Sequence, residues 1–99
     1  LDGSLVSSWG KPGMQLQRFC GCCNPTHFAI APDGAFITAE KGLTRVKEYG
    51  PAGDFRGAVA GADRFKDGGG GLDVTTGRKG TVYVLDPPAA VVRIFERIP

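Results

Sequence analysis

A unit of strand-like segments occurs twice in the sequence at a constant spacing of 46 residues (80 − 34, from Gly34 to Gly80). At this spacing, and without gaps, residues 36–40 align with 82–86, and residues 45–49 align with 91–95. Each unit reads as a strand, a glycine turn, a strand ending in an acidic residue, a short loop and a strand ending in an aromatic residue. A repeat of this length made only of short strands is typical of a β-propeller blade, so we expect an all-β fold.

Strand-like segments alternate along the chain with turns signalled by its 16 glycines and 7 prolines. The expected strands are residues 5–9, 27–31, 35–40, 45–49, 55–60, 72–75, 81–86 and 91–97. If strands are labelled a to d from the propeller axis outward, they form blades of four antiparallel strands in the order d-abcd-abc. We therefore expect a single domain over residues 1–99, in which 1–10 supply an outer strand, 24–60 a full blade and 71–99 three strands of a second blade.

Charge and hydropathy narrow the classes of partner. The net charge is only +2, and the basic residues are scattered among acidic ones. Because a nucleic-acid-binding surface needs a basic patch or stripe, we expect no nucleic-acid partner. No apolar run approaches the roughly 20 residues of a membrane-spanning helix, so we expect no membrane insertion.

The first unit resembles an NHL repeat, a β-propeller family. The resemblance lies in a proline before the first strand, an Asp-Gly turn, an acid ending the second strand and an Arg-Val-x-x-aromatic third strand; the residues are Pro25, Asp33-Gly34, Glu40, Arg45-Val46 and Tyr49. The second unit retains Gly80, Asp86 and the segment from Val92 to Phe95, but has Arg78-Lys79 in place of the Pro and Asp of the first turn.

The resemblance implies a blade from a propeller that usually has six blades. NHL proteins range from protein and RNA binding to a copper- and zinc-dependent lyase, so the fold alone does not fix the function. The lyase members use His ligands from several blades, whereas this chain has only His27. The segment from Phe19 to Pro25 is also similar to bacterial NHL-type proteins with a Gly-Cys-Cys-Asn-Pro stretch. That similarity favours an extracytoplasmic (periplasmic or secreted) location.

Cys20, Cys22, Cys23 and His27 form the one cluster with the composition of a metal site. Thiolates and an imidazole suit zinc or Cu(I), but adjacent cysteines do not easily point at one tetrahedral ion. A disulfide among the three cysteines and free structural thiols are the two alternatives, and all three readings stay open. An odd number of cysteines leaves at least one unpaired within the chain.

Glu40 and Asp86 end the second strand of each unit, and paired carboxylates suggest general acid–base chemistry. They occupy equivalent positions in neighbouring blades, however, where propeller repeats use an acid to hold loops through backbone N–H groups. We therefore expect the structural role for both.

The sequence predicts a non-catalytic NHL-type binding or scaffolding module, with a metal-dependent or redox enzyme domain using the Cys20/Cys22/Cys23/His27 cluster as the alternative. Two blades cannot close a ring within one chain. Each blade would leave one apolar face exposed, because a blade buries its faces only against neighbouring blades. We expect either missing blades of a longer chain or self-assembly, with a trimer completing a six-blade ring.

Overall fold

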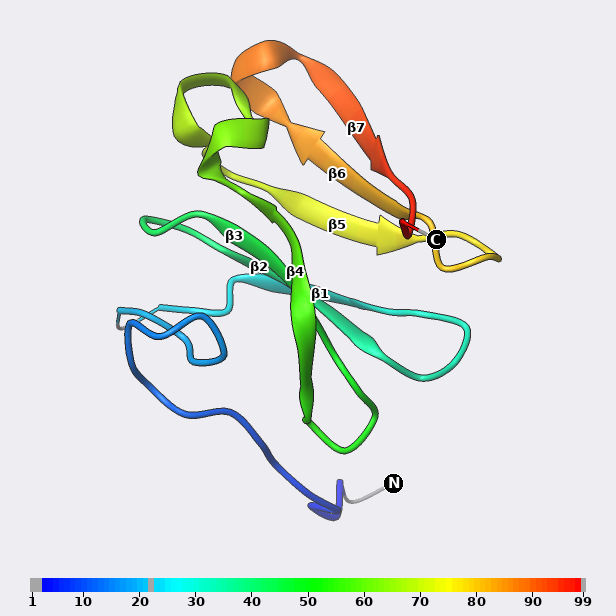
Figure 1. The fold of residues 1–99 in the computed structure, drawn as a ribbon. Coiled ribbons are helices and arrows are strands. Elements are labelled where there is room, and N and C mark those ends of the chain that lie inside the picture. The colour runs from blue at the N-terminus through cyan, green and yellow to red at the C-terminus, as the bar shows by residue number, and fades with distance from the viewer. Residues whose placement is uncertain (1–2, 22, 99) are drawn as a thin grey trace.

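The computed structural model describes residues 3–21 and 23–98, which form two antiparallel sheets (Figure 1). The first sheet contains β1 (His27–Ile30), β2 (Phe36–Glu40), β3 (Arg45–Tyr49) and β4 (Phe55–Gly61) in sequence order. The second contains β5 (Asp73–Thr76), β6 (Val82–Asp86) and β7 (Val91–Phe95). The all-β prediction is confirmed, and the strands lie where the repeat predicts them.

Three short 3-10 turns connect the strands: η1 (Ala62–Arg64), η2 (Lys66–Gly68) and η3 (Pro87–Ala89). The first of them lies in the stretch 62–66 between the two units. Among the described residues, no helix is long and apolar enough to cross a membrane.

The turn between β1 and β2 is a tight turn that depends on its glycine. Gly34 donates its N–H to the carbonyl of Ala31 at 2.9 Å, and the Asp33 carboxylate accepts the N–H of Ala35 at 3.0 Å. Gly34 has φ +89°, a left-handed conformation that glycine adopts without steric cost. Gly80, its counterpart, has φ +77° and closes the corresponding turn between β5 and β6.

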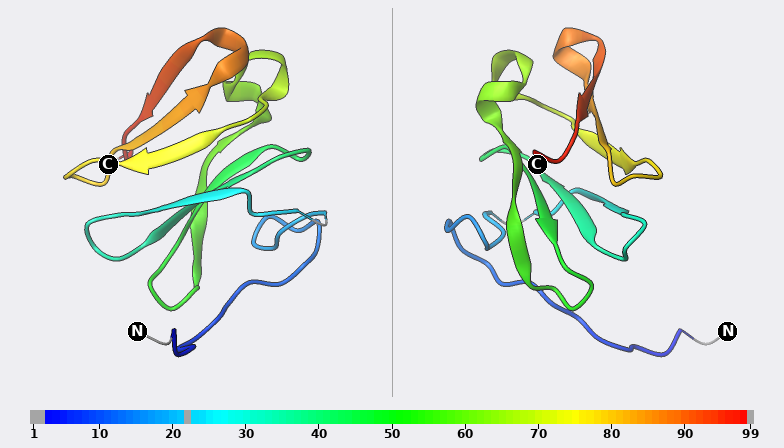
Figure 2. Two further views of the ribbon diagram at one scale, coloured as in Figure 1. Left: turned by 180° about the vertical axis from the view of Figure 1, so that it is seen from behind. Right: turned by 45° about the vertical axis from the view of Figure 1, so that its right-hand side comes forward.

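The two sheets pack face to face, and the core lies between them (Figures 1 and 2). Side chains alternate between the two faces of a strand, so each sheet presents two distinct surfaces. We call the face of the first sheet that packs on the second its inner face, and the opposite face its outer face. The inner face and the facing side of the second sheet form one cluster of buried residues: Ile37, Ala39, Val46, Ala60, Phe65, Leu72, Val74, Val82 and Val84.

The expected outer strand over residues 5–9 is absent from the single chain, because residues 3–10 are assigned to no strand. The segment runs along the first sheet on the side remote from the second (Figure 1). Trp9 packs there against Phe36 and Tyr49, with ring centroids 5.2 and 4.8 Å apart. This packing keeps the segment away from β7, so the second sheet has three strands within the chain rather than four.

Candidate functional site

The outer face of the first sheet is where the described polar and aromatic side chains gather. Residues of β2 and β3 pair across this face in register, Phe36 with Tyr49, Thr38 with Lys47 and Glu40 with Arg45. The segment 9–20, which we call the link, covers part of the face. Phe19 anchors it, because its buried ring lies 5.4 Å from that of Tyr49.

A buried ion-pair cluster lies at one end of this face. The Glu40 carboxylate accepts hydrogen bonds from Arg45 Nη2 at 2.8 Å and from Arg45 Nε at 3.2 Å. Lys47 Nζ lies 2.7 Å from Glu40 Oε1, and both side chains are fully buried. The N–H of Cys20 also donates to Glu40 Oε2, at 3.4 Å. One buried acid thus compensates two buried cations, and the cluster retains one excess positive charge.

Carbonyl oxygens of the link compensate that excess charge. Lys47 Nζ donates to the carbonyls of Leu16 and Arg18 at 2.8 and 2.7 Å. Arg45 donates to the carbonyls of Met14, Gln15 and Arg18 at 3.2, 3.2 and 2.9 Å. The Tyr49 hydroxyl donates to the carbonyl of Gln17 at 3.0 Å. Side chains of β3 therefore bind every backbone carbonyl from residue 14 to residue 18, and they give this irregular segment a defined path.

Burial changes the acid–base behaviour of two of these residues. Removal of Lys47 from water lowers the pKa of its ammonium group, because a low-dielectric environment penalises the charged form. The hydrogen bond to Glu40 acts in the opposite direction. Burial likewise raises the pKa of Tyr49 to about 12, and the negative charge of Glu40 adds to that effect. Tyr49 therefore remains a neutral donor at physiological pH.

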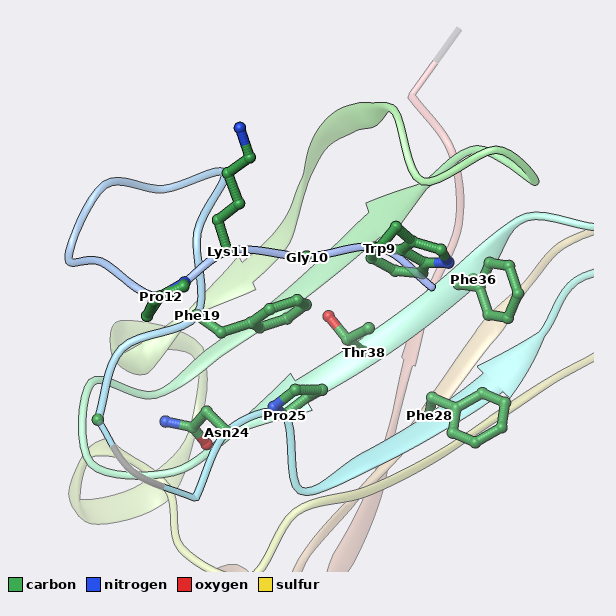
Figure 3. A pocket seen from close by; sticks show the side chains of 11 residues that line it. Trp9, Gly10, Lys11, Pro12, Phe19, Asn24, Pro25, Phe28, Phe36 and Thr38 are labelled. Carbon is green, nitrogen blue, oxygen red and sulfur yellow. The ribbon is translucent and has the colours of Figure 1, made fainter. Parts of the chain in front are cut away.

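A pocket of about 440 Å³ opens between the link and the outer face (Figure 3). Its walls are mainly apolar: Trp9, Pro12, Phe19, Pro25, Phe28 and Phe36, with Lys11 and Asn24 also lining it. Figure 3 shows the Thr38 side chain in the middle of the pocket, between Trp9, Phe19 and Pro25. Thr38 is 2% exposed, and its Oγ1 has no hydrogen-bond partner among the described residues. A buried hydroxyl without a partner is costly to the folded state.

The predicted cysteine–histidine cluster is only partly visible. Cys20 is half-buried, whereas Cys23 and His27 are exposed. Cys22 lies outside the described residues. Within residues 3–21 and 23–98, no three His, Cys, Asp or Glu side chains come together as a metal site. A zinc or copper site over Cys20, Cys22, Cys23 and His27 therefore stays a prediction, and metal analysis of the purified protein tests it.

The two strand-terminal acids both hold backbone N–H groups, which is the role that we expected for them. Glu40 accepts the N–H of Cys20, and Asp86 accepts the N–H of Lys66 at 2.9 Å. Asp86 also accepts a hydrogen bond from Arg93 Nε at 2.9 Å. These bonds lower the pKa of Asp86, with the Lys66 N–H as the larger cause.

Sequence reasoning missed the cluster of Glu40, Arg45 and Lys47 and the pocket beside it. A signal for part of it was present, because Arg18-Phe19 and Arg64-Phe65 are also 46 residues apart. Phe19 and Phe65 are both buried, and the next residue in each case donates its N–H to the strand-terminal acid. The repeat therefore extends upstream into the link.

Comparisons with known proteins give the chain no family. No protein-family model matches it, and no curated protein matches it either. The functional argument therefore rests on the chain's own residues and on the equivalence of its two sheets.

Proposed function

We propose that the chain is a non-catalytic, NHL-type β-propeller module whose two sheets act as consecutive blades and which associates with further blades through its second sheet. The support is a comparison of surfaces at the 46-residue spacing. Ile37, Ala39 and Val46 lie on the inner face of the first sheet, and their counterparts are Tyr83, Leu85 and Val92. These counterparts lie on the side of the second sheet that faces away from the first.

We call that side the free face; it consists of Asp73, Thr75, Tyr83, Leu85, Val92 and Ile94. Leu85, Val92 and Ile94 are 48%, 53% and 61% exposed, whereas Ala39 and Val46 are 0% exposed. A contiguous apolar surface on a sheet marks an interaction site in soluble proteins. The free face repeats a surface that the first sheet buries against a blade, so it is suited to bury itself against another.

Other copies of this chain are the partners that the proposal favours. A six-blade ring made from two sheets per chain needs three chains, and the association is heterologous because two different faces meet. Scaffolding follows from this geometry, since a closed ring presents the loops of every blade on its two rims. The Glu40 and Lys47 side chains are fully buried, so we assign this cluster a structural role.

Static light scattering coupled to size-exclusion chromatography tests the proposal. The chain has a mass of 10.4 kDa, so a trimer gives about 31 kDa. A folded species that stays at 10.4 kDa throughout a dilution series up to hundreds of micromolar contradicts self-assembly. Circular dichroism of the same fractions shows that the β structure persists in either case.

A further inference from the structure

The outer-face pocket occupies the position at which a preceding sheet would pack. At the 46-residue spacing, Phe28, Phe36 and Thr38 correspond to Val74, Val82 and Val84. Those three valines form the side of the second sheet that packs on the inner face of the first. The pocket side of the first sheet is therefore equivalent to a surface that already receives a sheet within this chain.

From this equivalence we infer that the pocket of one copy is the seat for the free face of a second copy, with Tyr83 and Leu85 of the incoming copy inserted against Trp9, Phe28 and Phe36. This inference rests on the proposed function and specifies the surface that completes it. The interface between the two sheets of one chain is its template, because Ile37 and Ala39 correspond to Tyr83 and Leu85.

Charge matches between the two surfaces. Asp73 carries the single charge of the free face and lies opposite Leu85 in the β5–β6 register. Lys11, which is positively charged, lines the pocket. The free face thus carries one negative charge and the pocket wall one positive charge, which favours this head-to-tail arrangement over contact between two free faces, where two aspartates would meet.

A pair of variants, each blocked on one surface, tests the inference. Leu85→Glu blocks the free face and leaves the pocket intact, whereas Phe28→Glu blocks the pocket and leaves the free face intact. Both side chains are substantially exposed, Phe28 at 61%, so neither change removes a buried residue. Each variant alone is expected to be monomeric. In a mixture, the free face of the Phe28→Glu chain still fits the pocket of the Leu85→Glu chain.

The measurement is an NMR titration of isotope-labelled Phe28→Glu protein with unlabelled Leu85→Glu protein, which detects even a weak single interface. Amide shifts are expected in β6 and β7 of the labelled chain, and none when unlabelled Phe28→Glu protein is added instead. Absence of shifts in the mixture, or self-association of Phe28→Glu protein alone, overturns the inference. If the wild type associates in the light-scattering experiment, the proposed function survives that result; if the wild type never associates, the proposed function fails as well.

Discussion

The two sheets have equivalent strands and turns, but their strand-terminal acids, Glu40 and Asp86, have different cationic partners. In both, a buried phenylalanine, Phe19 or Phe65, precedes a residue whose N–H donates to that acid. In the second sheet Arg93 alone pairs with Asp86, and the Arg93 side chain is 37% exposed. In the first sheet two cations share the buried Glu40. The acid that holds the N–H and one cation that pairs with it, Lys47 or its counterpart Arg93, are thus common to both units, and Arg45 is the cation that the first unit adds.

The pairing of two cations with Glu40 correlates with the path of the preceding segment. Before the second sheet, the chain passes directly from β4 through η1 and η2. Before the first sheet, the link has no strand to follow, apart from a single bridge between Pro12 and Phe19. Its carbonyls are instead bound by the side chains of β3, Arg45 and Lys47 above all. An irregular segment can be held in place when side-chain donors replace the ladder bonds of a strand.

The largest predicted effect separates the two acids. Glu40→Gln leaves two buried cations without an anionic partner, so we expect a loss of about 3–5 kcal/mol in the free energy of unfolding. Asp86→Asn, the matched control, should cost less, because half-exposed Arg93 keeps much of its hydration. Urea unfolding followed by circular dichroism measures both. An equal or greater loss for Asp86→Asn would show that the cluster around Glu40 contributes no more to stability than the Asp86–Arg93 pair.

The next effect tests whether the corresponding turns are equivalent. Gly34→Val and Gly80→Val each place a β-branched residue at positive φ, and we expect each to cost about 1–3 kcal/mol. Gly70→Ala is the control, because Gly70 has no positive φ and no atom lies within 4 Å of its added Cβ. That control should stay within about 0.5 kcal/mol of the wild type. An unchanged urea midpoint for either valine variant would show that this turn does not require a glycine and that the two turns are not equivalent.

A smaller, stabilising effect is expected when the second sheet is given the arginine that the first sheet has at the equivalent position. Val91 is the counterpart of Arg45, and Asp86 Oδ1 is buried without a hydrogen-bond partner among the described residues. Val91→Arg supplies a donor there and should raise the urea midpoint. The gain should vanish in the Asp86→Asn background. A gain that persists in that background would mean that the arginine acts elsewhere.

The smallest predicted effect is the pH dependence of stability that arises from ionisation of the Tyr49 hydroxyl. The pKa of Tyr49 is raised to about 12, above its ordinary value of 10.0, so the folded protein keeps this proton where the unfolded chain releases it. The stability that Tyr49 contributes is therefore complete below pH 10 and is lost as the pH rises toward 12. Ultraviolet titration should show one late-ionising tyrosine, and Tyr49→Phe should remove that phase. If the late phase survives the substitution, Tyr49 is not the group that ionises late, and the account of its burial is contradicted.

The repeat predicted the strands well, because strand alternation and turn glycines are local signals. Gly34 and Gly80 marked the turns, and residues 45–49 form β3 as expected. The strand predicted at residues 5–9 was wrong for the single chain, since strand formation depends on a partner edge that a sequence pattern does not supply. Trp9 finds aromatic partners on the outer face instead.

The site was harder to predict than the strands. Arg45 and Lys47 alternate on a strand in the way that solvent-exposed residues do, so their pattern gives no sign of burial. Their burial follows from the link, whose path is irregular and is set by tertiary contacts with the same side chains. The spacing between Arg18-Phe19 and Arg64-Phe65 was the only local sign that the link belongs to the repeat.

The dependence of thermal stability on protein concentration tests the central claim, that the free face is an unpartnered blade surface. Association of folded chains stabilises them by mass action, by up to about 1.4 kcal/mol for each tenfold rise in free partner. We predict that the Tm of the wild type rises with protein concentration. The Tm of Leu85→Glu should stay constant at the value that the wild type approaches on dilution. A wild-type Tm that is independent of concentration, or a Leu85→Glu Tm that rises equally steeply, would contradict the account.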